Sequence, residues 1–326
     1  FESDTIAAIA TPPGEGAIGI VRISGPRAHA VADTVFRPLH GLQPLSATPW
    51  RFRHGQVVDA SGQPVDEVMA VAMPAPRTYS GEPMAEIHGH GGQAVLQAIL
   101  GAVLEAGARP AGPGEFTRRA LLNGRMDLTQ AEAVIDLIQA RSETMRRAAA
   151  AMAGGTLRRA LDRIADQTAD LLARADAAVD FPEEDLPDLI TPAWFEAVRG
   201  VREQMAAHLA TYRAGRLFRE GAVIVIAGRP NAGKSTLFNR LLEEDRAIVT
   251  ESPGTTRVVL EGWAAFEGIA ARLLDTAGLR DTPEPVEWEG VSRARSAVAR
   301  ADLVLWVLDL TLSAETLREE WAGARE

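Results

Sequence analysis

The chain has 326 residues, of which 46% are hydrophobic, and its formal net charge at pH 7 is −10. This length exceeds that of a typical single domain, so we expect two or three domains. The sequence contains no cysteine, which excludes disulfides and thiolate chemistry within it and is typical of a cytoplasmic protein. The negative charge disfavours broad nucleic-acid binding, and the apolar runs are too short for a membrane helix, so we expect no membrane segment.

Residues 1–117 are predicted to form a mixed α/β domain. Apolar runs bounded by glycine and proline turns predict strands over residues 4–11, 16–25, 50–58 and 66–76. Residues 91–110 carry apolar side chains near every third or fourth position and end in Gly-Ala-Arg-Pro, which predicts a helix. The glycine- and proline-rich segments are predicted to be loops, and they cover residues 11–19 and 111–119.

Residues 118–215 are predicted to form a helical domain. Three apolar stripes follow helical spacing, and they are marked by Leu128, Ala131, Ile135 and Ile138, by Leu157, Leu161, Ile164, Thr168, Leu171 and Ala175, and by Trp194, Val198, Val201, Met205, His208 and Tyr212. Such stripes are typical of long helices that pack together. The acidic segment 180–192 is interpreted as a solvated loop between two helices, in preference to a metal or partner site.

Residues 216–326 are predicted to form an α/β domain. Apolar strands are expected at residues 222–228, 268–278 and 301–310, and helices are expected at residues 234–244 and 286–301. Strands that alternate with helices indicate a parallel sheet covered on both faces.

A glycine-rich turn between the first of these strands and the following helix fits the phosphate-loop pattern G-x-x-x-x-G-K-[ST]. Gly228 and Gly233 allow the backbone to curl so that its N–H groups point at phosphate oxygens. The helix that begins near Lys234 adds its positive dipole end, and the Lys234 ammonium faces the β- and γ-phosphates. The Ser235 hydroxyl is expected to bind Mg²⁺.

Two further motifs indicate which nucleotide is bound. The sequence Asp-Thr-Ala-Gly at residues 275–278 ends the second apolar strand, and Thr255 and Thr256 follow Ser235 by about twenty residues. These motifs, in this order and spacing, resemble a GTPase of the translation-factor-like class. An ATPase is a weaker interpretation, because Asp-Thr-Ala-Gly with Gly-Thr-Thr is a GTPase pattern. Leu279 stands where Ras-like enzymes place a water-orienting glutamine.

Longer segments of the chain are similar to the MnmE (TrmE) family of tRNA-modification GTPases. The segments that carry the resemblance are residues 11–25, 78–92, 113–138, 228–237, 251–257 and 275–290. The resemblance implies a multidomain fold: an α+β folate-binding N-terminal domain over residues 1–117, an all-α helical domain whose first part is residues 118–215, and an inserted α/β P-loop GTPase domain over residues 216–326.

The resemblance implies that the N-terminal domain dimerises and binds 5-formyltetrahydrofolate or a related tetrahydrofolate as one-carbon donor. The matching positions are Arg22, Glu86 and Arg125. A folate presents a pterin edge that needs a carboxylate acceptor and glutamyl carboxylates that need cations. For each of these residues taken alone, a surface salt bridge is the preferred interpretation. His88 and His90 suggest a metal, but without a third ligand in the sequence a turn or lining role is the preferred interpretation.

The resemblance also assigns the nucleotide and metal sites. The expected nucleotide-binding residues are Asn231, Ala232, Gly233, Lys234, Ser235, Thr236, Thr250, Thr255, Thr256, Asp275, Thr276, Ala277 and Gly278. Ser235 and Thr256 match magnesium ligands. Asn231, Thr250, Ser252 and Thr255 match a potassium site beside the phosphates. Glu287 matches the acid that orients the attacking water, although a carboxylate at a helix start is its alternative interpretation.

The implied activity is potassium-dependent GTP hydrolysis together with an MnmG-type flavoprotein, to place an aminomethyl-type group at carbon 5 of the wobble uridine of tRNAs. The alternative is a GTP-regulated binding switch of the ribosome-assembly type without one-carbon chemistry. Val258 replaces the aspartate usual after Gly-Thr-Thr-Arg, and no N-K-x-D guanine-reading motif follows residues 301–310. We therefore expect an incomplete GTPase domain, which binds nucleotide poorly if the protein ends at Glu326.

Overall fold

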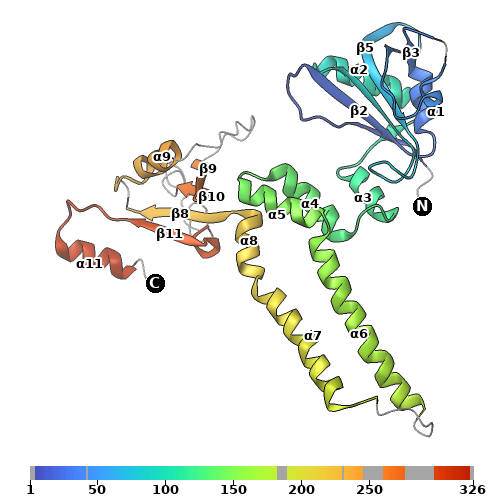
Figure 1. Cartoon of the computed structure of the whole chain (residues 1–326). Coiled ribbons are helices and arrows are strands. Elements are labelled where there is room, and N and C mark those ends of the chain that lie inside the picture. The colour runs from blue at the N-terminus through green and yellow to red at the C-terminus, as the bar shows by residue number, and fades with distance from the viewer. Residues whose placement is uncertain are drawn as a thin grey trace. The chain divides into compact units, whose positions relative to one another are not determined.

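The computed structural model describes residues 4–41, 43–181, 189–229, 231–244, 260–275 and 297–323 (Figure 1). It divides into two compact units, residues 1–131 and residues 132–326. The predicted fold class is confirmed, because an α+β part, a helical part and an α/β part follow one another along the chain. The predicted domain boundaries near residues 117 and 215 stay predictions. No helix in the described part of the chain has the length and apolar character needed to cross a membrane.

The first unit contains a seven-stranded sheet in the order β3-β4-β5-β6-β2-β1-β7. Its strands are β1 (Ile6–Ile9), β2 (Ile18–Ser24), β3 (Phe36–Pro38), β4 (Arg53–Val58), β5 (Pro64–Met73), β6 (Met84–His90) and β7 (Arg109–Pro110). Neighbouring strands are antiparallel except for β1 and β7, which are parallel. The four predicted strands are confirmed as β1, β2, β4 and β5.

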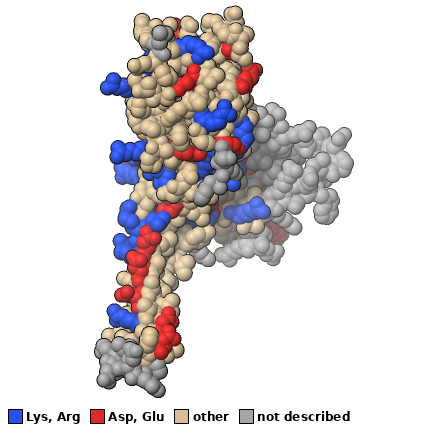
Figure 2. Space-filling view, turned by 90° about the vertical axis from the view of Figure 1, so that its right-hand side faces the viewer, with Lys and Arg blue, Asp and Glu red and all other residues tan. Residues whose placement is uncertain are grey.

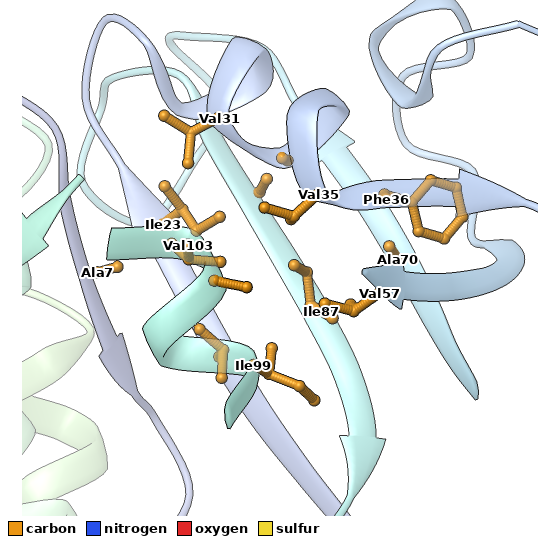
Figure 3. Packing of buried hydrophobic residues seen from close by; sticks show 14 of the residues in the cluster. Ala7, Ile23, Val31, Val35, Phe36, Val57, Ala70, Ile87, Ile99 and Val103 are labelled. Carbon is orange, nitrogen blue, oxygen red and sulfur yellow. The ribbon is translucent and has the colours of Figure 1, made fainter. Parts of the chain in front are cut away.

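Two helices cover one face of this sheet and form the core of the unit. They are α1 (Ala28–Val35), which the sequence did not predict, and α2 (Gln93–Glu105), which confirms the predicted helix. Figure 3 shows side chains of both helices, among them Val35 and Ile99, packed against Ile23 of β2 and Ile87 of β6. Each such side chain contributes about 1.5–3 kcal/mol through burial. The other face of the sheet carries polar and partly exposed residues.

The segment 111–119 is not a loop throughout, so this prediction is wrong for its second half. Helix α3 (Glu115–Leu122) follows strand β7 and begins inside this segment. A short 3₁₀ turn at Leu45–Ala47 lies earlier in the chain. The Gly112 N–H donates to the Glu115 side chain at 2.7 Å. A carboxylate in the first turn is favoured by the helix dipole, so Gly-Pro-Gly here marks a helix start.

The helical part contains α4 (Leu128–Gln139), α5 (Glu143–Ala153), α6 (Thr156–Asp180), α7 (Pro192–Ala210) and α8 (Tyr212–Glu220). Helices α6 and α7 run side by side as a long hairpin (Figure 1), and the Trp194 indole donates to the Leu171 carbonyl at 3.1 Å. The three predicted apolar stripes thus lie on helices. Figure 2 shows acidic and basic side chains interspersed along the face in view, in agreement with the absence of a net positive charge.

The α/β part is a four-stranded sheet in the order β11-β8-β10-β9. The strands are β8 (Ala222–Gly228), β9 (Leu260–Phe266), β10 (Ile269–Asp275) and β11 (Leu303–Val307), and helices α9 (Lys234–Glu244) and α11 (Ala314–Gly323) accompany them. Strands β8, β10 and β11 are parallel, as predicted, but β9 is antiparallel to β10. The expectation of a purely parallel sheet is wrong because Glu267 and Gly268, both at positive φ, form a tight hairpin turn.

Strand β8, which leads into the phosphate loop, is fixed at its start to the helical part. Gly221 joins α8 to β8 at φ +80°, and the Trp263 ring of β9 lies over it. Arg141 stacks on the same ring, with its guanidinium carbon 4.6 Å from the ring centre. Asp302 pairs with Arg216 of α8 and also accepts the Val223 N–H. The strand that carries the phosphate loop is therefore held in position before the loop begins.

Candidate functional site

The phosphate loop starts where β8 ends, and its backbone has the unusual angles that the glycines were predicted to allow. Gly228 has φ +142°, and a Cβ atom there would lie 2.4 Å from the Val307 carbonyl oxygen. No other residue fits this approach without moving β11. Asn231 and Gly233 follow at φ +61° and +92°. The turn thus curls back toward the start of α9.

Lys234 is the first residue of α9, and its side chain is only 5% exposed. Its ammonium donates to the Arg229 carbonyl at 2.7 Å. The Leu237 N–H already bonds the Gly233 carbonyl at 2.9 Å, so the helix starts directly at the loop. A cation at the N-terminus of a helix, where backbone N–H groups have no partner within the helix, is an arrangement that can bind phosphate.

Beside this lysine, Ser235, a predicted magnesium ligand, meets Asp275, the first residue of the Asp-Thr-Ala-Gly motif. The Ser235 hydroxyl donates to a carboxylate oxygen of Asp275 at 2.7 Å, across 40 positions of sequence. Asp275 is fully buried at the last position of β10, directly opposite Ile226 of β8. Hydroxyl and carboxylate oxygens suit Mg²⁺, which normally takes few protein ligands and completes its shell with water and phosphate. The residues present therefore fit the ion.

The remaining predicted nucleotide residues divide into two groups. Ala232 and Thr236 lie in the described loop and first helical turn, where the Ala232 N–H bonds the Arg229 carbonyl at 3.3 Å and Thr236 is exposed. The other predicted positions lie outside the described residues: Thr250, Ser252, Thr255, Thr256, Thr276, Ala277, Gly278 and Glu287, with Val258 and Leu279. Their assignments stay predictions.

The open face of the N-terminal sheet brings together two of the three predicted folate residues. Arg22 of β2 and Glu86 of β6 stand opposite each other in the sheet register, and the Arg22 Nε atom donates to Glu86 at 2.8 Å. The second Glu86 oxygen lies 3.2 Å from the His88 ring nitrogen. Both partners of the ion pair are partly buried. Glu86 therefore presents a carboxylate whose orientation is fixed from two sides.

Aromatic rings that the sequence analysis did not identify surround Arg22. Its guanidinium carbon lies 5.4 Å from the Tyr79 ring centre and 5.7 Å from that of Phe116. Arg125 reaches the same loop, because its Nε atom donates to the Thr78 carbonyl at 3.3 Å. Among the described residues, no hydrogen bond or ion pair is found between Arg125 and the Arg22–Glu86 pair. Tyr79 and Phe116 carry no sequence signal for this position, since only the folded domain brings β2, the segment before β6 and helix α3 together at residues 22, 79 and 116.

A groove of about 750 Å³ continues along this face from His88. Its apolar lining is Ile18, Phe52 and Met69, and its polar lining includes His54, His88, His90 and Glu67. The Phe52 and His88 rings meet edge to face at 4.8 Å. Among the described residues there is no group of three or more side chains that could hold a metal ion. His88 and His90 line the groove, as the sequence analysis preferred.

A charge network holds α3, and hence the segment leading to Arg125. Glu115 binds Arg109 at 2.6 Å and the buried Arg119 at 3.1 Å. Arg119 also reaches Asp4 at 2.7 Å and Glu82 at 3.2 Å. The hydrogen bond from Arg109 lowers the pKa of Glu115 to about 2 from its ordinary 4.5, against the opposing effect of burial. Glu115 is therefore ionised at neutral pH.

An α+β domain with an open sheet face, a helical part and a sheet carrying a phosphate loop define a multidomain P-loop nucleotide-binding protein. The sequence profile of the GTP-binding protein TrmE N-terminus matches residues 5–125, and the profile of the MnmE helical domain matches residues 128–320. The chain belongs to the MnmE family of tRNA modification GTPases.

Individual relatives lead to the same family. The tRNA modification GTPase MnmE of Heliobacterium modesticaldum is 47% identical to this chain, over 98% of this chain and 70% of the relative. The protein of the same description in Symbiobacterium thermophilum is 46% identical, also over 98% of this chain and 70% of the relative. A third, in Roseiflexus sp., is 49% identical over 95% of this chain and 66% of the relative. The solved GTP-binding protein of Sulfolobus solfataricus with GDP is 17% identical over 64% of this chain and 53% of that chain, and its TM-score of 0.24 is too low to support a conclusion.

Proposed function

We propose that this protein is a potassium-dependent GTPase that acts with an MnmG-type flavoprotein to install an aminomethyl-type group at carbon 5 of the wobble uridine of tRNAs. The observation that carries the proposal is the 2.7 Å contact of Ser235 with Asp275 beside the buried Lys234. Family membership supports guanine as the base, since the family consists of tRNA modification GTPases.

Four side chains act on the triphosphate and its metal ion. Lys234 places its positive charge at the β- and γ-phosphates, and the loop N–H groups donate to the phosphate oxygens. The Ser235 hydroxyl, the Asp275 carboxylate and the Thr256 hydroxyl would hold Mg²⁺. The ion supplies charge neutralisation of the phosphates when it is bound. Bond breaking at the γ-phosphate is then favoured by charges that are already in position.

Two assignments complete the hydrolytic site. Glu287 orients the attacking water, because the leucine at position 279 has no polar group for this task. Asn231, Thr250, Ser252 and Thr255 hold K⁺ beside the phosphates, where its charge acts as an arginine finger does in other GTPases. Asn231 supports the second assignment, since its left-handed backbone places it inside the loop with an exposed side chain.

The N-terminal domain carries 5-formyltetrahydrofolate as one-carbon donor. Glu86 accepts hydrogen bonds from the pterin edge. Because Arg22 is bonded to Glu86 at 2.8 Å, it acts at the same end of the ligand and orients Glu86. The glutamyl carboxylates lie at the other end of a folate, and Arg125, whose side chain is exposed, is the predicted cation for them. Two copies pair through this domain, and the flavoprotein supplies the reducing chemistry.

The test is GTP turnover of the full-length protein in potassium and in sodium chloride at equal ionic strength. We expect turnover to be several-fold faster in potassium, because a sodium ion does not suit the same ring of oxygens. Equal rates in the two salts would count against the potassium assignment. Loss of modified wobble uridine in cells that lack the protein, restored by the wild-type gene, tests the tRNA assignment.

The alternative is a GTP-regulated binding switch of the ribosome-assembly type. The match of residues 5–125 to the TrmE N-terminus disfavours it, because such switches carry RNA-binding modules in this place. Calorimetric titration with 5-formyltetrahydrofolate distinguishes the tRNA-modification function from the binding switch. Binding supports one-carbon chemistry, and absence of binding to a folded protein supports the switch.

A further inference from the structure

Helix α11 contacts the phosphate loop through one ion pair. The Glu320 carboxylate on α11 lies 3.0 Å from the Arg229 guanidinium, and Arg229 is the first residue after β8. The Arg229 side chain is 55% exposed, whereas that of Glu320 is only 10% exposed. The neighbouring Glu319 is exposed. The helix thus turns one of two adjacent carboxylates toward the loop.

Burial makes Glu320 dependent on this arginine. Both of its carboxylate oxygens are buried, and neither has an aligned hydrogen bond in the described part of the chain. Arg229 is its cationic partner there. A buried carboxylate costs several kcal/mol unless a counter-charge stands beside it. The ion pair therefore constrains Arg229 more strongly than a surface salt bridge would, since surface pairs contribute about 0–1 kcal/mol.

The backbone of Arg229 holds the phosphate-binding lysine. Its carbonyl oxygen accepts the Lys234 ammonium at 2.7 Å and the Ala232 N–H at 3.3 Å. Arg229 thus pairs with α11 through its side chain and with Lys234 through its carbonyl oxygen. A loop that already has its bound shape loses less conformational entropy when the nucleotide arrives.

We propose that Glu320 is a positioning residue of the phosphate site, which pre-organises the loop for nucleotide through its ion pair with Arg229. This inference rests on the proposed nucleotide-binding function. Glu320 does not touch the phosphates, so its loss weakens binding without removing any group that contacts the nucleotide. The effect falls on the dissociation constant and the KM for GTP, and kcat stays near its wild-type value.

The experiment measures binding of methylanthraniloyl-GDP by fluorescence to the full-length protein and to four variants. We expect Glu320→Gln and Arg229→Gln each to raise Kd by about 3- to 10-fold, because each leaves the pair broken and the loop less ordered. The double variant is expected to be no weaker than either single one, since both remove the same interaction. Glu319→Gln, the matched control, is expected to bind as the wild type does.

The outcomes separate this inference from the proposed function. If the wild type binds and Glu320→Gln binds equally well, or if the two single effects multiply in the double variant, the positioning role is wrong. If the wild type does not bind, the proposed function and this inference both fail. Should Glu320→Gln not fold, the exchanged pair Arg229→Glu with Glu320→Arg replaces it, and recovery of affinity above that of Arg229→Glu alone supports the ion pair.

Discussion

The phosphate site and the N-terminal groove differ in how their residues come together. Gly228 to Ser235 are consecutive, and the loop needs only a strand before it and a helix after it. Arg22 and Glu86 are 64 positions apart and meet only because β2 and β6 pair in one register. A one-residue slip of that register would turn one of them to the helix-covered face. A site built from local sequence is robust to such errors, and a site built from sheet register is not.

The largest expected effect belongs to the local site. Lys234→Ala removes the buried charge that we propose faces the phosphates, so GTP affinity is expected to fall by about 10²- to 10³-fold. Equilibrium binding of a fluorescent GTP analogue measures it. Asn239→Ala, on the exposed side of the same helix, is the control and should bind normally. If Lys234→Ala kept the GTP affinity of the wild type, the assignment of this loop to phosphate binding would be wrong.

A second variant tests whether the local site extends beyond its loop. Glu287→Ala is expected to keep GTP affinity and to slow hydrolysis by about 10²-fold, since it would lose the group that orients water. Single-turnover hydrolysis with saturating GTP measures the rate. Glu289→Ala, two positions away, is the matched control. Equal losses of binding and turnover would instead indicate that Glu287 has a structural role.

A substitution at the Arg22–Glu86 site should weaken ligand binding less than one at the phosphate loop, and it should leave the phosphate loop unaffected. Among the residues that the structure describes, Arg22→Ala leaves Glu86 with His88 as its side-chain partner, and we expect about a 10-fold loss of 5-formyltetrahydrofolate affinity by calorimetry. GTP turnover without folate should not change. Arg37→Ala on β3, at the opposite edge of the sheet, is the control. An unchanged folate affinity would show that the ion pair is only a structural feature of the sheet.

The smallest effect concerns the network that supports Arg125. Glu115→Gln is expected to lower the Tm of the N-terminal unit by about 3–6 °C at pH 7. Because the pKa of Glu115 is lowered to about 2 from 4.5, its stabilisation is present above pH 4.5 and is lost as the pH falls toward 2. Circular-dichroism melting at pH 7, 4 and 2.5 should show that the Tm difference between the wild type and Glu115→Gln becomes smaller as the pH falls. Glu105→Gln, at the exposed end of α2, is the control and should have the Tm of the wild type. If the Tm difference of Glu115→Gln did not depend on pH, the ion pair would be excluded as its cause.

The same contrast explains which parts of the fold were predictable. Helix α9 and strand β8 begin and end at the predicted residues because glycine and apolar periodicity mark their ends. Strand β6 was not predicted, since its alternating residues on the open face are Glu86, His88 and His90 and give no apolar run. Strand β9 was missed because its pairing depends on a hairpin turn formed by Glu267 and Gly268.

The candidate sites follow the same division. The sequence identified Lys234, Ser235 and Asp275 because each belongs to a motif with a fixed spacing. It could not identify Tyr79, Phe116 or the groove, because their residues come from segments that are distant in sequence and meet only in the folded domain. Glu320 was missed for a third reason, since one glutamate among several on an exposed helix carries no sign that it alone is buried.

Lys234 has one more property that the printed sequence makes plain. It is the only lysine in these 326 residues, and every other basic side chain apart from histidine is an arginine. Reagents that modify primary amines, and enzymes that acetylate them, therefore have a single side-chain target within this sequence, and that target is the buried ammonium of the phosphate loop. Mass spectrometry of one tryptic peptide would report the accessibility of the loop without any engineered label.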